Sequence, residues 1–85
     1  MAIVTMRYWA AAKDAAGVAE QRVTADTLAA ALAAVSGAAG GERLAVVLAR
    51  SSFLIDGNPV GLRAADSVQL REGSVVEVLP PFAGG

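Results

Sequence analysis

A strict alternation of apolar and polar side chains opens the chain. Over residues 3–9, IVTMRYW, the side chains of Val4, Met6 and Tyr8 share one face of an extended segment, and the residues between them share the other. This period of two is typical of a strand with one buried face. Residues 19–25, AEQRVTA, predict a second and more polar strand, and a strand of that composition is expected at an edge of a sheet.

The main helix is predicted to follow this second strand. Leu28, Leu32 and Val35 repeat at i, i+4 and i+7 and form one apolar stripe on an alanine-rich segment. Asp26 or Thr27 can cap the start of the helix, because either side chain can accept a hydrogen bond from the first turn. Two shorter helices are expected at residues 10–17, ending at Gly17, and at residues 42–50, with Leu44, Val47 and Leu48 facing inward.

Two further strands complete the pattern. Residues 53–60, FLIDGNPV, predict a strand that runs into an Asp-Gly-Asn-Pro turn. Residues 75–81, VVEVLPP, predict the last strand, which the two prolines end because proline has no N–H group to donate to a neighbouring strand. This order of elements favours an α+β fold in which a mixed sheet packs on one main helix. It is the order of the β-grasp, or ubiquitin-like, fold, and residues 1–80 are expected to form its single domain.

The same parity count places several residues outside the core. Val76 and Val78 take the inward positions of the last strand, so Glu77 points outward, as Arg7 does on the first strand. If these two strands are neighbours, Arg7 and Glu77 form an exposed cross-strand pair, which is an ordinary surface feature of proteins.

Large apolar side chains also fall on the outward face, near one end of the predicted sheet. They are Trp9 and Leu79, with Phe82 just beyond the last strand. Clustered outward apolar side chains indicate a docking patch for a partner protein. The alternative is that loops fold over these side chains and bury them.

The composition removes most kinds of chemistry from the side chains. Among the 85 residues there is no cysteine and no histidine, so the chain lacks a thiol nucleophile, the commonest general base and the commonest metal ligand, and no metal site is predicted. The glycine-rich residues 36–41 lack the Lys-Ser/Thr pair of a phosphate-binding loop, so no bound cofactor is expected. Seven basic and eight acidic residues, spread without runs, give a net charge of −1, which argues against nucleic-acid and membrane-surface binding.

The apolar residues do not indicate a membrane protein either. No stretch approaches the ~18 consecutive apolar residues of a membrane span. The start of the chain lacks a basic leader followed by an apolar run, so no signal peptide is predicted and a cytoplasmic protein is expected.

One reactive group remains, the carboxylate of Gly85 at the end of LPPFAGG. Activated by ATP on another enzyme, it would become an acyl-adenylate that sulfur or an amine can attack. Glycines suit this use because, without a Cβ, they can pass through a narrow channel. Residues 81–85 are therefore predicted to form a flexible tail, and the residues expected to insert into a partner ahead of Gly85 are Pro80, Pro81, Phe82, Ala83 and Gly84. The alternative is a frayed terminus without a role.

Two segments carry a family resemblance. VLPPFAGG resembles the ending of the small subunit of molybdopterin synthase, a sulfur-carrier family whose members finish in a strand, Pro-Pro, an apolar residue, a small residue and Gly-Gly. MRYWAAAKDAAG is similar to the opening strand, aromatic pair, short basic-acidic helix and glycine of the same family. The resemblance covers most of the chain and is loosest from Ser36 to Arg63. Pro-Pro before the tail favours this branch over the carrier of the thiamine pathway.

The resemblance implies a β-grasp sulfur carrier without a catalytic site of its own. Gly85 would be adenylated by a ubiquitin-activating-like adenylyltransferase, which uses the ATP, and then converted to a thiocarboxylate. The tail would enter the large subunit of the synthase and donate sulfur to a pyranopterin precursor in molybdenum cofactor biosynthesis. Gly84 and Gly85 match the tail of the family, and Trp9 and Leu79 match apolar positions of its partner-facing surface.

Other functions of the same tail stay open. The chain could carry sulfur for another pathway, of the thiamine or cysteine type. It could instead be a ubiquitin-like modifier, in which activated Gly85 forms an isopeptide bond with lysines of target proteins. A third alternative is an interaction module with an inert tail, since a fold alone does not assign a function.

Overall fold

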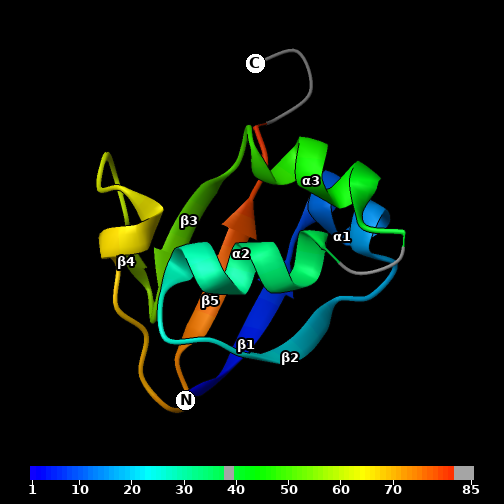
Figure 1. The fold of residues 1–85 in the computed structure, drawn as a ribbon. Coiled ribbons are helices and arrows are strands. Elements are labelled where there is room, and N and C mark those ends of the chain that lie inside the picture. Colours follow the sequence, from blue (N-terminus) through cyan, green and yellow to red (C-terminus); the bar gives the residue numbers. More distant parts are fainter. Residues whose placement is uncertain (38–39, 82–85) are drawn as a thin grey trace.

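The computed structural model describes residues 1–37 and 40–81 of the chain. Its elements, in order, are β1 (Ile3–Tyr8), α1 (Ala10–Ala16), β2 (Glu20–Thr24), α2 (Leu28–Ser36), α3 (Glu42–Leu48), β3 (Ser52–Ile55), β4 (Asn58–Pro59), the 3-10 turn η1 (Ala65–Ser67) and β5 (Val75–Leu79). Figure 1 shows the strands as one sheet, with α2 lying across one of its faces and α1 and α3 at one end.

The strands form a five-stranded mixed sheet in the order β2-β1-β5-β3-β4. The central pair, β1 and β5, is parallel, and the other pairs are antiparallel. A mixed sheet of this order, covered by helices on one face, is the β-grasp fold that the sequence predicts. The first and last strands are therefore neighbours, although they are separated by most of the chain.

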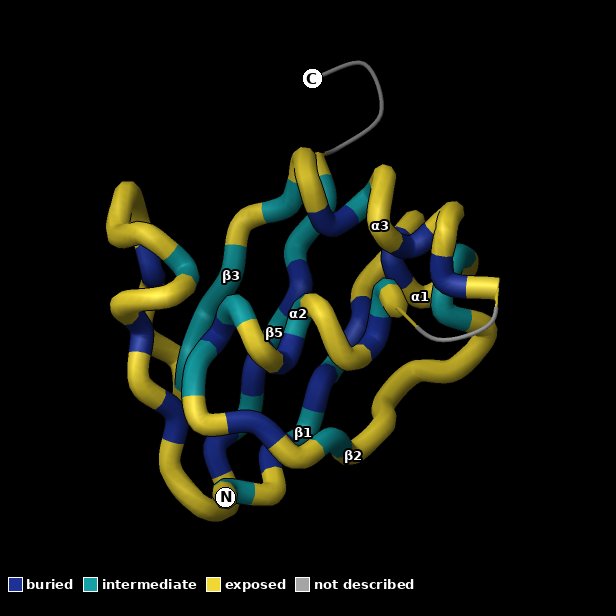
Figure 2. Tube along the Cα trace, viewed as in Figure 1, coloured by how far each residue is buried: buried dark blue, intermediate teal, exposed yellow. Residues whose placement is uncertain are grey.

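The predicted inward faces of these two strands form the centre of the core. Their inward side chains are all at most 2 % exposed: Val4, Met6, Tyr8, Val76 and Val78. Figure 2 shows this buried band running along β1 and β5 beneath α2. The period of two in the sequence thus identifies the buried face correctly.

The main helix α2 does not cover the sheet alone. Helix α2 has nine residues and spans about 13 Å at ~1.5 Å per residue, whereas five strands about 4.8 Å apart are wider than that. The shorter helices cover the remainder, and Ala12 of α1 and Leu44 and Leu48 of α3 join the core. On α2 itself Ala31 is buried between Leu28 and Val35, while Leu32 is only half-buried.

The two candidates for the cap of α2 have different roles. The Oγ1 atom of Thr27 accepts a hydrogen bond from the N–H of Ala30 at 3.1 Å, so Thr27 is the N-cap. Asp26 Oδ1 instead accepts from the N–H of Ala2 at 2.9 Å and ties the start of the chain to this loop. At the predicted end of α1, Gly17 has a φ of 79°, and its N–H donates to the carbonyl of Lys13.

The predicted turn after β3 is shorter than the sequence indicates. Asp56 and Gly57 alone make the turn, with φ angles of 50° and 85°, because both central residues of a tight hairpin of this type need positive φ. Asn58 and Pro59 already belong to β4, which pairs with β3 at the edge of the sheet. An edge position accommodates Pro59, since a proline there leaves no inner ladder bond unmade.

Candidate functional site at the end of strand β5

The end of β5 is held on both sides by other strands. Val78 lies opposite Tyr8 of β1, and Leu79 lies opposite Ser52 of β3. The N–H of Trp9 donates to the carbonyl of Val78 at 3.3 Å, which extends the pairing one residue past β1. Pro80 and Pro81 follow, so the chain leaves the sheet at a defined point. The predicted tail residues Phe82, Ala83, Gly84 and Gly85 lie outside the described residues.

Trp9 and Leu79 of the predicted docking patch lie at this same end of the sheet. Trp9 is 48 % exposed and is the N-cap residue of α1, where its carbonyl accepts from the N–H of Ala12 at 3.0 Å. Leu79 is half-buried. Phe82, the third predicted member, lies outside the described part of the chain, so the patch as a partner interface stays a prediction.

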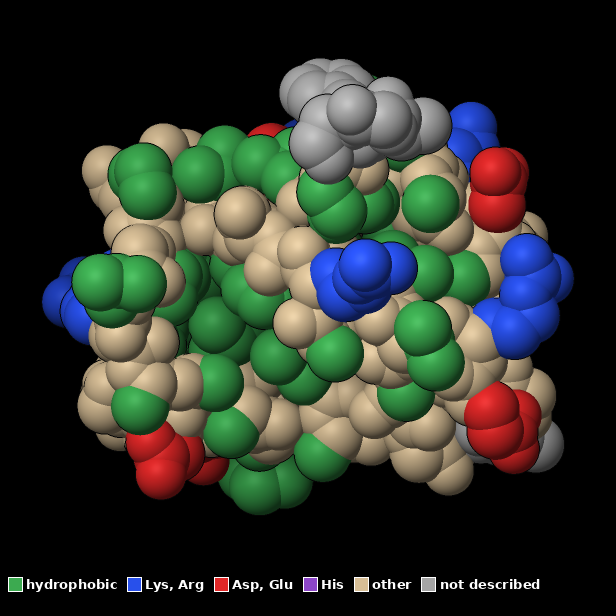
Figure 3. Space-filling view, turned by 90° about the horizontal axis from the view of Figure 1, so that it is seen from above, with side chains coloured by type: hydrophobic (Ala, Val, Ile, Leu, Met, Phe, Trp, Pro, Cys, Tyr) green, Lys and Arg blue, Asp and Glu red, His purple; other side chains and the backbone are tan. Residues whose placement is uncertain are grey.

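A groove beside Pro80 and Pro81 is a feature that the sequence pattern does not predict. It has a volume of about 360 Å³ and is lined by residues of α1 and α3 and by the two prolines: Ala10, Ala11, Val46, Val47, Arg50, Pro80 and Pro81. Val46 is 65 % exposed and lies off the inward stripe of α3. An apolar residue at such an outward helix position is the signal in the sequence that could have indicated the groove. Figure 3 looks onto this end of the molecule and shows hydrophobic side chains gathered around a basic one.

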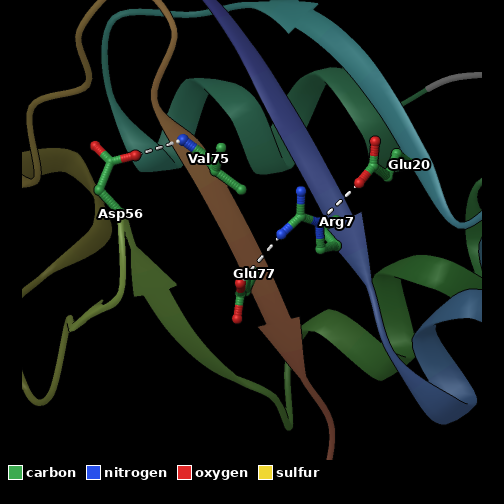
Figure 4. A network of polar contacts seen from close by, with 5 residues as sticks. All are labelled: Arg7, Glu20, Asp56, Val75 and Glu77. Carbon is green, nitrogen blue, oxygen red and sulfur yellow. Dashed lines mark hydrogen bonds and ion pairs between the residues drawn. The ribbon is translucent and has the colours of Figure 1, made fainter.

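A row of charges crosses the outward face of the sheet (Figure 4). Arg7 and Glu77 are opposite each other, with Nη1 and Oε1 3.5 Å apart, which confirms the predicted pair. The shorter contact of Arg7 is with Glu20 of β2, at 2.7 Å between Nε and Oε2. The hydrogen bond that Arg7 donates to Glu20, and then the negative charge of Glu20, raise the pKa of Arg7 above its usual value. Such exposed pairs are ordinary surface features and usually stabilise a fold little.

A metal site would appear as a cluster of described side chains that could hold the ion. Within residues 1–37 and 40–81, no group of three or more Asp and Glu residues is arranged to hold a metal ion. None of the described helices is long and apolar enough to cross a membrane. What the structure provides is a β-grasp domain in which Pro80 and Pro81, after β5, lie beside an apolar groove, with the exposed side chain of Trp9 at the same end of the sheet.

The sheet order and the covering helices are those of the ubiquitin-like β-grasp fold. Comparison with family models identifies the branch, because the model of the ThiS family matches residues 6–85. The chain belongs to the ThiS family, the group of β-grasp sulfur carriers. No curated protein matches the sequence significantly.

Solved structures agree on the fold. The solution structure of small archaeal modifier protein 1 from Methanosarcina acetivorans superposes with a TM-score of 0.81 at 21 % identity, covering 100 % of this chain and 98 % of that one. A Pyrococcus furiosus protein named as subunit 1 of molybdopterin converting factor gives 0.78 at 19 % identity, covering 96 % and 100 %. The complex of subunits 1 and 2 of molybdopterin-converting factor from Helicobacter pylori 26695 gives 0.71 at 20 % identity, covering 98 % and 99 %.

Proposed function

We propose that this sulfur carrier is the small subunit of a molybdopterin synthase and that it carries sulfur on the C-terminal carboxyl group of Gly85. One observation carries the proposal: the family match extends to Gly85, four residues beyond Pro81, which follows the end of β5. Four extended residues reach roughly 13–14 Å, which is enough to enter a buried site while the domain stays outside it.

The chemistry begins with the activation of a poor electrophile. A terminal carboxylate is ionised at neutral pH and resists attack by nucleophiles. On an adenylyltransferase it would attack the α-phosphorus of ATP, releasing pyrophosphate and forming a mixed anhydride with AMP. Sulfide, or a persulfide together with a thiol reductant, would then attack the carbonyl carbon. AMP leaves, and a thiocarboxylate remains on Gly85.

Two partners follow from this chemistry, the activating adenylyltransferase and the large subunit that receives the tail. Support for the second is the likeness to a chain of the Helicobacter pylori complex of subunits 1 and 2. The groove beside Pro80 and Pro81, with the exposed side chain of Trp9 nearby, offers each partner an apolar surface at the base of the tail. Buried aromatic and aliphatic anchors of this kind contribute most of the binding energy in many interfaces.

A second candidate function is protein modification. It is favoured by the likeness to the archaeal modifier protein, whose fold superposes over the whole of this chain. The activated intermediate would be the same in both cases. A lysine amine, in place of sulfur, would attack the carbonyl carbon of Gly85, release AMP and form an isopeptide bond. Sulfur delivery to a thiamine-type or cysteine-type pathway would share every step except the final acceptor.

The test is reconstitution followed by intact-mass analysis. The chain is incubated with the adenylyltransferase of the same organism, ATP and sulfide, and a reaction without ATP is the control. We expect a mass increase equal to the difference between sulfur and oxygen, in the ATP reaction only. The large subunit and the cyclic pyranopterin precursor are then added, and the mass should return to its starting value as the dithiolene forms.

Other outcomes separate the alternatives. A thiocarboxylate that persists in the presence of the large subunit and precursor would point to another sulfur acceptor. Covalent adducts on lysines of added proteins would point to the modifier. If the mass does not change in the presence of ATP, the carrier proposal is wrong.

A further inference from the structure

Strand β2 leaves an edge of the sheet without a neighbour in the described part of the chain. In the strand order it is bonded to β1 alone, and Figure 1 shows it at the border of the sheet with no helix beyond it. Its partner bonds show which way its backbone groups point. The N–H of Tyr8 donates to the carbonyl of Ala19, and the N–H of Ala25 donates to the carbonyl of Ala2, each at 2.8 Å. Residues 19 and 25 therefore direct their backbone groups toward β1.

The backbone N–H and C=O groups of successive residues point to opposite sides of a strand, so the directions at residues 19 and 25 give the directions at the residues between them. Residues 21 and 23 also face β1, whereas Glu20, Arg22 and Thr24 direct their N–H and C=O groups to the free edge. These residues lie opposite Arg7, Thr5 and Ile3, and their side chains therefore lie on the outward face. Both the hydrogen-bonding groups and the exposed side chains of this edge thus come from the same three residues.

The charge row on the outward face stops at this edge. It runs from Glu77 through Arg7 to Glu20, with contacts of 3.5 and 2.7 Å (Figure 4). Arg22, two residues further along β2, is exposed and makes no side-chain hydrogen bond or ion pair with another described residue. A positive group placed next to Glu20 across the edge would continue the alternation of charge.

We propose that β2 pairs antiparallel with β2 of a second copy of this chain, with Glu20 of each copy opposite Arg22 of the other. The two-fold axis then passes beside Gln21, and the pairing places two opposite-charge pairs across the interface. It joins two five-stranded sheets into one continuous sheet. An isologous contact of this kind closes after two copies.

The charges of β2 select this register over its neighbours. Only residues that direct their backbone groups outward can form the hydrogen-bonded pairs, so each allowed register moves the partner by two residues. One shift brings Arg22 opposite Arg22, and the shift in the other direction brings Glu20 opposite Glu20. Like charges directly opposite each other destabilise a strand pair, whereas opposite charges stabilise it.

This pattern differs from the usual protection of sheet edges. Edges are commonly protected by charged side chains, most often lysine, by proline or by a very short strand. The other edge of this sheet has Pro59 in a two-residue strand. Strand β2 has five residues and no proline or lysine, and its two charges are opposite in sign. Strand β5 lies two strands inside this edge, so the dimer leaves the tail accessible, and the inference does not depend on the proposed function.

The interface is small and polar, so the dimer should be weak. Interfaces at the low end of the size range form transient complexes, and we expect dissociation constants between roughly 10 μM and 1 mM. Sedimentation equilibrium of the full chain, from micromolar to millimolar concentration, should show the mass rising from one chain to two. Added salt should reverse the rise, because exposed ion pairs are screened.

Charge reversal tests the register directly. In R22E the glutamate introduced on each copy would lie opposite Glu20 of the other, so association should fall about tenfold or more. The control is R63E, which makes the same change of charge on an exposed arginine beside β4, at the opposite edge of the sheet, and should dimerise as the parent does. Thermal melts of both variants establish that they are folded.

A mixture of two variants gives the decisive measurement. E20R alone would place two arginines opposite each other and should be monomeric. Mixed with R22E, it restores an opposite charge at both positions, and a one-to-one heterodimer should form more tightly than either variant self-associates. The proposal is overturned if the parent is monomeric at millimolar concentration, if R22E dimerises like the parent, or if the two variants fail to associate.

Discussion

The single tyrosine of the chain offers a sharp test of the core. Tyr8 lies on the inward face of β1, is only 2 % exposed, and its Oη donates to Oε1 of Gln21 at 2.7 Å. Burial disfavours the ionised ring and raises the pKa of Tyr8 from 10.0 to about 12. In the unfolded chain the same ring is hydrated and titrates near its ordinary value of about 10.

This difference sets the sign and size of a pH effect on stability. Between pH 10 and pH 12 the folded chain retains a proton that the unfolded chain has lost, so the free energy of unfolding falls as the pH rises. The stabilisation is fully present below about pH 10 and is lost as the pH passes through the folded pKa. Two pKa units at about 1.4 kcal/mol each correspond to a loss of roughly 2–3 kcal/mol over this window.

The assay combines urea unfolding at a series of pH values with the ultraviolet absorbance of tyrosinate in the folded protein. Only one tyrosine contributes to that absorbance, so its midpoint reports Tyr8 alone. The variant Tyr8→Phe should lose about 1 kcal/mol with the hydrogen bond to Gln21 and should lose most of the pH dependence in this window. A folded-state midpoint near pH 10 would refute the reasoning, because it would mean that water reaches the ring.

The remaining predictions concern the tail, the partner surface and the hairpin. Trp9→Ala or Leu79→Ala should weaken binding to the adenylyltransferase or the large subunit by about 2 kcal/mol, measured by calorimetry. The melting temperature of either variant should change little. Unchanged affinity in both variants would exclude the docking patch. Deletion of Gly85 should abolish thiocarboxylate formation at an unchanged melting temperature. The terminal carboxylate moves by ~3.5 Å in this variant, and a displacement of even ~1 Å can lower a rate a hundredfold. Normal activation of the variant would mean that Gly85 is not the reactive group. Asp56→Ala should lower the free energy of unfolding in urea by about 1 kcal/mol, because Oδ1 of Asp56 accepts from the N–H of Val75 at 2.9 Å. Asp56→Asn retains the acceptor and tolerates positive φ, so it should cost less. Equal losses in the two variants would mean that this bond does not matter.

Local patterns in the sequence predict much of this fold because they depend on neighbouring residues only. The alternation around Met6 and the parity of Val76 and Val78 identify the buried face, and Gly17 identifies the end of α1. The contact between Arg7 and Glu20 could not be predicted in this way. This contact depends on the register between β1 and β2, which places Arg7 opposite Glu20. The register is set by backbone hydrogen bonds between residues far apart in the sequence, so no local pattern predicts it.

The same limit applies to the candidate site. Trp9 and Leu79 could be placed on one surface by parity, since each lies in or next to a strand whose buried face is evident. Val46 and Arg50 could not be, because their position beside Pro80 depends on how α3 packs against α1 and not on any pattern within α3. The role of Gly85 rests on the sequence and on the family match, since this residue lies outside the described part of the chain.

Strand direction explains why distant segments meet at the base of the tail. Because β1 and β5 are parallel, their carboxyl ends lie at the same edge, and Trp9 leaves β1 where Pro80 leaves β5. Because β3 is antiparallel to β5, its first residue, Ser52, lies opposite Leu79, which brings the end of α3 to that edge as well. Helices α1 and α3 therefore lie beside Pro80 and Pro81, and residues of both line the groove there. The topology that pairs β5 on both sides thus also builds the groove beside Pro80 and Pro81.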